Sequence, residues 1–352
     1  MPVLVAAPDK FRGTATAAQI AAAASRAGAR LGWSVIESPL SDGGEGLLEA
    51  TQRPGDELQT AEVTGPLGPP VTAAWLHGPD RCVIEMAQAS GLALAGGRGD
   101  NRPMEATTRG TGQLLVAAAR ALSGAGNPSG SDGSPPTIIV GLGGSATTDG
   151  GLGALEVVES AGGLGRVKLV AACDVEVGFL DAARVFAPQK GATPRQVAEL
   201  TERLDRLADE YETRFGVNVR DLPGAGAAGG LGGAVVALGG RLEVGYRLVA
   251  ELVGLDRVLH QADLVITGEG ALDATSFSGK VVGGVLGDAA AIGVPVLVIV
   301  GRATPEAIEL AGGYGAQVVS LRDRFGDARA HGDTVGCVEE AVTQALEAFG
   351  RG

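Results

Sequence analysis

The stretch Thr137–Gly151, TIIVGLGGSATTDGG, is the part of the chain that most clearly indicates the fold. Its first four residues are β-branched and predict a buried strand. Glycines then turn the chain towards a helical segment, and Ser145, Thr147, Thr148 and Asp149 lie in this turn. A helix start leaves backbone N–H groups unpaired, and these groups favour an anion such as phosphate. The stretch therefore predicts a strand–turn–helix unit with an anion site.

Glycine abundance leaves a second interpretation of this motif, a purely structural turn. Glycine makes up 58 of the 352 residues, so the glycines alone are a weak signal. The hydroxyl groups and the carboxylate of Asp149, which follow a well-defined strand pattern, favour a functional anion site instead. A carboxylate there can activate a hydroxyl group or hold a metal ion, so the motif indicates phosphoryl transfer.

Strand-like and helical segments alternate at both ends of the chain. Strands are predicted at 2–7, 33–38, 137–140, 168–174, 263–267, 294–300 and 316–321, and helices at about 15–30, 109–122, 194–215 and 334–348. Such alternation is typical of a parallel sheet covered by helices. Residues 58–87 have turns between β-like runs, which predicts an antiparallel unit.

We therefore expect an α/β fold with two domains. Residues 1–60 with 258–352 are predicted to form a discontinuous flavodoxin/Rossmann-like domain, with helices on both faces of a parallel sheet. Residues 61–257 are predicted to form an inserted mixed α/β domain. Ligands of open parallel sheets bind at the carboxyl ends of the strands, where these glycine turns lie. Gly124–Pro136, GAGNPSGSDGSPP, is predicted to be a flexible loop without chemistry.

Composition excludes several classes of protein. A net charge of −13 without a basic stripe, and only 3% aromatic residues, argue against binding of nucleic acid. No apolar run reaches membrane-spanning length, and the N-terminus does not resemble a signal peptide. Three scattered cysteines and three histidines show neither a disulfide framework nor zinc spacing. We expect a cytoplasmic protein, and the charge is compatible with a homodimer.

Lysine is scarce, which makes its positions informative. The chain has four lysines among 28 basic residues, and Lys10, Lys190 and Lys280 all lie in predicted turns. A compact ammonium group suits contact with phosphate or carboxylate as a point charge. Exposed turns are also common places for lysine, but this clustering favours a function for at least one of the three.

Four further segments carry candidate chemistry. In SDGGEG, Asp42 can accept a hydroxyl proton, bind magnesium or cap the following helix. Pro223–Gly233 offers amides to a nucleotide, or simply packs closely. Glu269 and Asp273 precede Lys280 and suit a magnesium–phosphate pair or a solvated acidic loop. Arg109, in TTRGTG, either orients an anion or begins a helix. No Walker A sequence occurs.

Taken together, these segments resemble the bacterial glycerate kinase family, which phosphorylates glycerate with ATP. The blocks that carry the resemblance are APDKFRGT (7–14), SDGGEG (41–46), VTGPLG (63–68), IEMAQASGL (84–92), TTRGTG (107–112), GLGGSATTDGG (141–151), ACD (172–174), FAPQKGA (186–192), PGAGAAGGLG (223–232) and VITGEGALD…SGK (265–280). They run in order over almost the whole chain. The resemblance implies two α/β domains, one flavodoxin-like and discontinuous, and magnesium-dependent phosphorylation of D-glycerate by ATP, with 2-phosphoglycerate favoured over 3-phosphoglycerate.

Residue chemistry then suggests roles for individual side chains. The predicted catalytic residues are Asp42, Asp149, Lys190 and Lys280, where either aspartate is the base and the lysines neutralise charge. The predicted substrate-binding residues are Asp9, Lys10, Ser41 and Arg109. The predicted phosphate- or nucleotide-binding residues are Gly143, Gly144, Ser145, Gly226, Gly229 and Gly230. The predicted magnesium ligands are Glu269 and Asp273.

The chain departs from the family pattern in places, and this keeps alternatives open. The segment 163–186 is shorter and lacks the Asn-Pro-Leu stretch, Ala187 replaces a glycine, and Ala274-Thr275-Ser276 replaces a Gln-Thr/Ser pair. One alternative is a non-catalytic sensor that binds glycerate or a nucleotide. Another is a kinase of the galactokinase–mevalonate kinase type, whose GLGSS loop is similar. A dinucleotide-dependent oxidoreductase is disfavoured, because no G-x-G-x-x-G follows the first strand.

Overall fold

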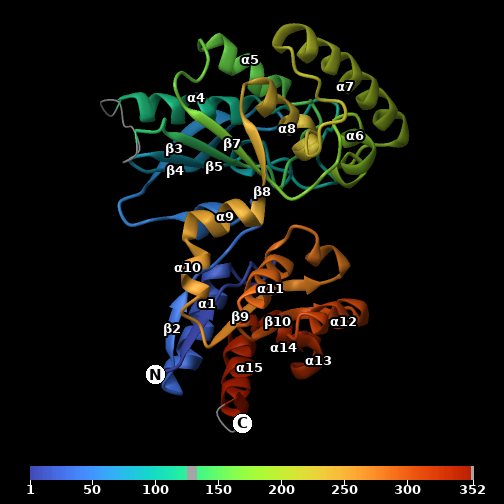
Figure 1. The fold of residues 1–352 in the computed structure, drawn as a ribbon. Helices are drawn as coiled ribbons and strands as arrows, with labels where there is room; N and C mark the ends of the chain where they lie inside the picture. The colour runs from blue at the N-terminus through green and yellow to red at the C-terminus, as the bar shows by residue number, and fades with distance from the viewer. Residues whose placement is uncertain (125–132, 350–352) are drawn as a thin grey trace. The chain divides into compact units, whose positions relative to one another are not determined.

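The computed structural model describes residues 1–124 and 133–349, and its chain divides into two compact units (Figure 1). Unit 1 comprises Met1–Asp42, Glu49–Thr51 and Tyr246–Gly352, and unit 2 comprises Gly43–Leu48 and Gln52–Gly245. The domain boundaries predicted at 60/61 and 257/258 stay predictions. Most of the predicted flexible loop, residues 125–132, lies outside the described residues.

Unit 1 contains a five-stranded sheet in which every pairing is parallel. Its strands are β1 (Val3–Ala6), β2 (Ser34–Glu37), β9 (Leu264–Leu272), β10 (Val296–Ala303) and β11 (Gln317–Ser320). The spatial order is β11-β10-β9-β1-β2. This is the flavodoxin-like order 2-1-3-4-5. The strands are added in one direction across the sheet up to the second strand and in the opposite direction from the third, so the order reverses between the first and third strands. The predicted flavodoxin-like parallel sheet is therefore confirmed.

Helices connect and cover these strands. They are α1 (Ala17–Arg30), α9 (Gly245–Val253), α10 (Leu255–Leu259), the 3₁₀ helix η2 (Ala274–Phe277), α11 (Val281–Ala291), α12 (Pro305–Gly313), α13 (Leu321–Phe325), α14 (Asp327–Gly332) and α15 (Thr334–Phe349). Alternate strand residues such as Leu4, Leu264 and Ile266 share a buried core with α1 and α15. A capping box between Thr16 and Gln19 begins α1, as its sequence favours.

Unit 2 contains a mixed six-stranded sheet in the order β3-β4-β5-β6-β7-β8. Its strands are β3 (Glu57–Thr64), β4 (Pro70–His77), β5 (Arg81–Glu85), β6 (Thr137–Gly141), β7 (Lys168–Cys173) and β8 (Arg241–Val244). The first three strands pair antiparallel, and β5 to β8 pair parallel. The antiparallel unit expected over 58–87 and the mixed α/β class are therefore confirmed.

The helices of unit 2 pack on this sheet around one large core. They are α3 (Ala87–Ser90), α4 (Arg109–Gly124), α5 (Leu152–Ser160), α6 (Asp181–Phe186), the 3₁₀ helix η1 (Pro188–Lys190), α7 (Pro194–Phe215) and α8 (Ala227–Ala237). The short helix α2 (Leu47–Thr51) has residues in both units. Sequence reasoning missed α6, η1 and β8, because such short elements carry too little periodicity. Among the described residues, no helix is long and apolar enough to span a membrane.

Candidate functional site

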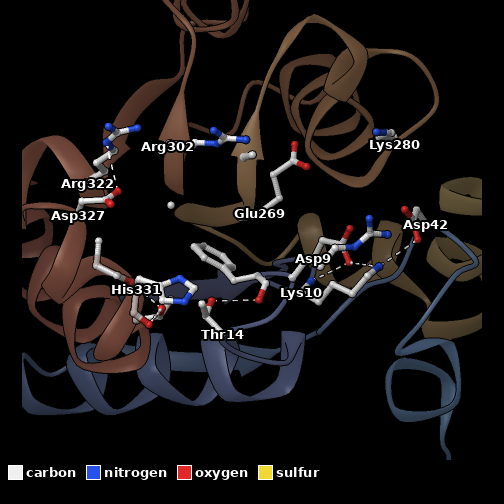
Figure 2. Close-up of a pocket in the computed structure, with 17 residues that line it drawn as sticks. Asp9, Lys10, Thr14, Asp42, Glu269, Lys280, Arg302, Arg322, Asp327 and His331 are labelled. Carbon is white, nitrogen blue, oxygen red and sulfur yellow. Dashed lines mark hydrogen bonds and ion pairs between the residues drawn. The ribbon is translucent and has the colours of Figure 1, made fainter. Parts of the chain in front are cut away.

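The carboxyl ends of the unit 1 strands surround a cavity of about 680 Å³ (Figure 2). Asp9 follows β1, Glu269 lies near the end of β9, and Arg302 lies near the end of β10. The reversal in strand order falls between β1 and β9, which is where ligands of such sheets bind. The other lining residues of this cavity with a charged or ionisable side chain are Lys10, Arg12, Asp42, Lys280, Arg322, Asp327 and His331.

Asp9, Lys10 and Asp42 form a charged cluster on one wall of this cavity (Figure 2). The Nζ of Lys10 lies 3.3 Å from Oδ1 of Asp42 and 3.6 Å from Oδ1 of Asp9. Burial raises the pKa of Asp9 to about 6, although the charge of Lys10 opposes the shift. Burial alone lowers the pKa of Lys10, but the two carboxylates outweigh it and the net shift is upward. The lysine therefore stays protonated beside two acids.

Glu269 presents a carboxyl oxygen that the chain leaves unsatisfied. Its Oε1 is buried and has no hydrogen-bond partner among the described residues. Burial raises the pKa of Glu269 to about 7, while the Ser276 hydroxyl and the Lys280 charge oppose this. An unsatisfied buried oxygen is costly, so this position suits a cation or a donor from a ligand.

Asp273 and Lys280 are held by local contacts. The Oδ1 of Asp273 accepts hydrogen bonds from the N and Oγ1 of Thr275, at 2.8 and 2.6 Å, and caps η2. Asp273 lines a cavity of about 420 Å³ that adjoins the larger one and shares Arg302 and Arg322 with it. The Nζ of Lys280 donates to Thr275 Oγ1 at 3.3 Å, and Lys280 lines the larger cavity. Glu269 thus lines the larger cavity and Asp273 the adjoining one.

The segment after β2 contributes Ser41 and Asp42. Ser41 is buried directly before Asp42. The N-cap residue of α2, directly before Leu47, is Gly46, so Asp42 does not cap this helix. The capping interpretation of Asp42 is therefore wrong, because four residues separate it from the helix start.

The turn after β6, in unit 2, is clamped by a buried lysine. The Nζ of Lys190 donates to Ser145 Oγ at 2.8 Å and to the carbonyl of Thr147 at 2.6 Å. Lys190 is 3% exposed, and burial lowers its pKa to about 7, although the charge of Asp149 opposes the shift. The structure therefore brings together Ser145 and Lys190, which sequence reasoning assigned to phosphate.

Asn101 adds a second clamp that sequence reasoning missed. Its Nδ2 donates to the carbonyl of Ala146 at 3.1 Å and to that of Lys190 at 2.8 Å. This buried amide ties the β6 turn to the backbone of η1. The NRP sequence at 101–103 resembles an ordinary loop, so only the long-range contacts reveal the role.

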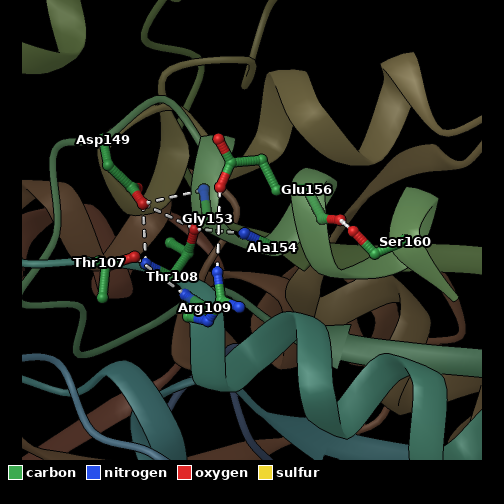
Figure 3. A network of polar contacts seen from close by, with 8 residues as sticks. All are labelled: Thr107, Thr108, Arg109, Asp149, Gly153, Ala154, Glu156 and Ser160. Carbon is green, nitrogen blue, oxygen red and sulfur yellow. Dashed lines mark hydrogen bonds and ion pairs between the residues drawn. The ribbon is translucent and has the colours of Figure 1, made fainter. Parts of the chain in front are cut away.

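Asp149 is held at the start of α5 by several donors (Figure 3). Its Oδ2 accepts from the N and Oγ1 of Thr108, both at 2.8 Å, and from the N of Gly153 at 3.4 Å. Its Oδ1 accepts from the N of Gly151 at 3.2 Å. Burial raises the pKa of Asp149, and these hydrogen bonds oppose the shift. The carboxylate thus joins the β6–α5 turn to the start of α4.

Arg109 begins α4 and lies on the surface of unit 2 (Figure 3). Its side chain is 52% exposed, and its Nη1 lies 4.0 Å from Oε2 of Glu156 on α5. Its backbone N donates to Thr107 Oγ1 at 3.2 Å. These contacts are those of an ordinary helix start with a surface ion pair.

The glycines of the two glycine-rich turns allow close backbone packing. A Cβ at Gly143 would lie 2.5 Å from the Cα of Gly44, and one at Gly229 would lie 2.0 Å from the carbonyl O of Thr147. Gly144 is exposed and has a φ of +75°. Gly226, Gly229 and Gly230 are all buried. Packing accounts for Gly143 and the second turn, and contact with phosphate stays a prediction for these residues.

Arg302 and Arg322 are cavity residues that sequence reasoning did not single out. Each follows an apolar strand run that the sequence does show, at 294–300 and 316–321. A search for charged residues directly after predicted parallel strands would have found both. The described residues contain no group of three or more His, Cys, Asp or Glu placed to hold a metal ion.

Comparison with known proteins identifies the family of the chain. The model of the glycerate kinase family matches residues 4–160 and 158–349. An uncharacterized protein of Mycobacterium bovis is 41% identical, over 86% of this chain and 79% of its own length. Glycerate 2-kinase of Escherichia coli is 36% identical, with 86% of each chain covered.

A solved structure agrees with the fold. The crystal structure assigned as glycerate kinase 2 of Salmonella typhimurium has a TM-score of 0.77 and 30% identity, and 99% of each chain is covered. The family match argues against the galactokinase–mevalonate kinase alternative. The chain therefore belongs to the glycerate kinase family and is a phosphotransferase that uses an alcohol group as acceptor.

Proposed function

We propose that this protein transfers the terminal phosphoryl group of ATP to a hydroxyl group of D-glycerate, giving 2-phosphoglycerate and ADP. The observation that carries the proposal is the unit 1 cavity, where cations and carboxylates meet at the strand reversal. The name of the Escherichia coli relative, glycerate 2-kinase, supports the 2-position over the 3-position. Phosphoryl transfer mainly needs positioning and charge neutralisation, and this cavity offers both.

Asp42 is the proposed base. It lines the cavity and contacts the protonated Lys10 through Oδ1. The hydroxyl oxygen of glycerate forms its bond to the terminal phosphorus as the bond to the leaving ADP oxygen breaks, and Asp42 accepts the hydroxyl proton. Asp9, Lys10 and Ser41 are proposed to hold the substrate on the same wall.

Asp149 is the weaker candidate for the base. Its two oxygens already accept four hydrogen bonds from the chain. Because these donors already occupy both carboxyl oxygens, the carboxylate has little capacity left to accept a proton from a substrate hydroxyl group. We propose that Asp149 instead positions the β6–α5 turn.

Lys280 and Lys190 are the proposed cationic residues, and each is described within its own unit. Lys280 lines the unit 1 cavity and is proposed to neutralise charge on the transferring phosphoryl group. In unit 2, Lys190 is proposed to keep Ser145 and the amides at Gly143 and Gly144 in place for phosphate. Because Arg109 is paired on the surface with Glu156, its proposed contact with substrate has the least support.

Magnesium fits Glu269 better than Asp273. The buried Oε1 of Glu269 has no partner among the described residues, whereas Oδ1 of Asp273 is already engaged in capping η2. Magnesium is commonly held by one or two carboxylates together with substrate phosphates, so a large carboxylate cluster is not required. When bound, the ion would supply neutralisation of phosphate charge.

The test is ADP release from purified protein with ATP, magnesium and D-glycerate, with each component omitted in turn. We expect turnover that requires glycerate and disappears with EDTA. ³¹P NMR of the product would then distinguish 2-phosphoglycerate from 3-phosphoglycerate. Tight binding of glycerate or ATP without ADP release would contradict the proposal and favour the sensor alternative.

A further inference from the structure

We propose that a second cavity, within unit 2, binds the adenine base and the ribose of the nucleotide. It has a volume of about 290 Å³ and lies between α7, the loop at 103–106 and the β6–α5 turn. This inference rests on the proposed function, since it assigns the part of ATP that the charged cavity of unit 1 does not suit.

The lining of this cavity is mainly apolar. Leu204 and Leu207 of α7, Leu152 of α5 and Met104 of the loop form its walls. Such side chains suit a flat purine ring and offer nothing to glycerate, which carries an oxygen on every carbon atom. The volume is close to the lower end of the range of ~300–1,000 Å³ for small-molecule sites, so it suits a nucleoside rather than a whole nucleotide.

One wall carries a polar group that the chain leaves unsatisfied. Thr148 lines the cavity and is 1% exposed, and its Oγ1 has no hydrogen-bond partner in the part of the chain that the structure describes. A buried hydroxyl without a partner costs free energy. A ring nitrogen or a ribose hydroxyl group of the ligand would satisfy it.

The position of Thr148 along the chain connects this cavity to the phosphate turn. Ser145, which Lys190 holds, is three residues away, so their Cα atoms are at most about 11 Å apart. Arg206 contributes a guanidinium group to the cavity lining. With its nucleoside part in this cavity, ATP directs its phosphates along the turn that the glycines and Ser145 form.

Hydrogen bonds of Arg203, on α7, hold the loop at 103–106 that forms one wall of the cavity. The Nη1 of Arg203 donates to the carbonyl of Met104 at 3.1 Å, and its Nη2 donates to Glu199 at 2.7 Å. These contacts fix the loop at 103–106 against α7, so the apolar walls are preformed.

The first experiment compares Thr148→Val with Thr201→Val. Valine has the shape of threonine but no hydroxyl group, and the hydroxyl of Thr201 bonds only to the Val197 carbonyl of its own helix. Because Thr148 Oγ1 has no partner among residues 1–124 and 133–349, Thr148→Val should not lower the melting temperature. We expect it to raise the KM for ATP about fivefold and to leave the KM for glycerate unchanged. Thr201→Val should change neither KM.

Equilibrium binding separates this inference from the proposed function. In calorimetric titrations, Thr148→Val should raise the dissociation constants of ATP and adenosine about fivefold. Inorganic tripolyphosphate should bind the wild type and the variant equally. These titrations do not depend on turnover, so a sensor without kinase activity would give the same result. Equal binding of adenosine to both proteins, or an altered KM for glycerate instead, would overturn the assignment.

A variant that fills the cavity gives a second test. Leu207→Phe adds volume to the apolar wall and should weaken the binding of ATP tenfold or more, while the binding of tripolyphosphate persists. Its control is Glu202→Phe, which places the same ring on an exposed position of α7. If Leu207→Phe folds and binds ATP as the wild type does, the cavity is not the nucleoside site.

Discussion

The buried carboxyl groups of the two units differ in how many hydrogen bonds they accept from the chain. In unit 1, Glu269 has a carboxyl oxygen without a partner among the described residues, and Asp9 has a raised pKa beside a lysine. In unit 2, Asp149 accepts four hydrogen bonds from the chain around it. The comparison teaches that a carboxylate with unused hydrogen-bonding capacity is available for ligands, whereas a saturated one holds the fold together.

The largest effect is expected from Asp42→Asn. Loss of a general base should lower kcat by about 10²–10⁴-fold, and the melting temperature should change little because Asp42 lines a cavity. The measurement is steady-state ADP release, with Asp149→Asn as the matched variant. If Asp149→Asn folds normally and loses more turnover than Asp42→Asn, the assignment of the base is reversed.

Asp149→Ala should act on stability instead. The change removes the acceptor for the donors of Thr108, Gly151 and Gly153 and leaves buried N–H groups unpaired. We expect the free energy of unfolding to fall by about 3 kcal/mol, measured by urea denaturation. Thr108→Val, which removes only one of these donors, should cost less. A variant as stable as the wild type would show that the network is not structural.

Glu269→Gln should change how stability depends on pH. The pKa of Glu269 in the folded state is about 7, above its ordinary value of 4.5, so the folded state binds more protons between these pH values. Stability is therefore fully present below pH 4.5 and is lost as the pH rises through 7, by about 2 kcal/mol for this partly buried group. Asp9, with its pKa raised to about 6, adds a loss of the same sign.

Melting curves at pH 5 and pH 7.5, without magnesium, would measure this loss. The decrease in stability between the two pH values should be smaller in Glu269→Gln than in the wild type. The variant should also need more magnesium for turnover. An unchanged pH dependence would mean that Glu269 is not buried as the structure has it.

The smallest effect is expected from Asp273→Asn. Asparagine caps helices as well as aspartate does, so the free energy of unfolding should change by less than about 0.5 kcal/mol. Since Oδ1 of Asp273 is engaged with Thr275, the magnesium concentration for half-maximal rate should stay within about twofold of the wild type. A tenfold rise would restore Asp273 as a magnesium ligand.

Much of the architecture could be predicted, because its signals are local. The β-branched run at 137–140, the capping box at Thr193 and the turn residues after each strand act over a few residues. The cavity could be placed only in general terms, at the carboxyl ends of the strands. Asn101 escaped prediction because its partners lie far away in the sequence, whereas Arg302 and Arg322 follow predicted strands and could have been found.

The sequence by itself determined the family, the alternation of strands and helices, and the residue types available for phosphoryl transfer. Only the tertiary structure decided which of these residues remain available to a ligand. Asp42, Asp149, Glu269 and Asp273 are similar in sequence, since each acid lies near glycine after a strand. They differ because burial and hydrogen bonding come from distant segments, such as Thr108 for Asp149, and no local pattern records such contacts.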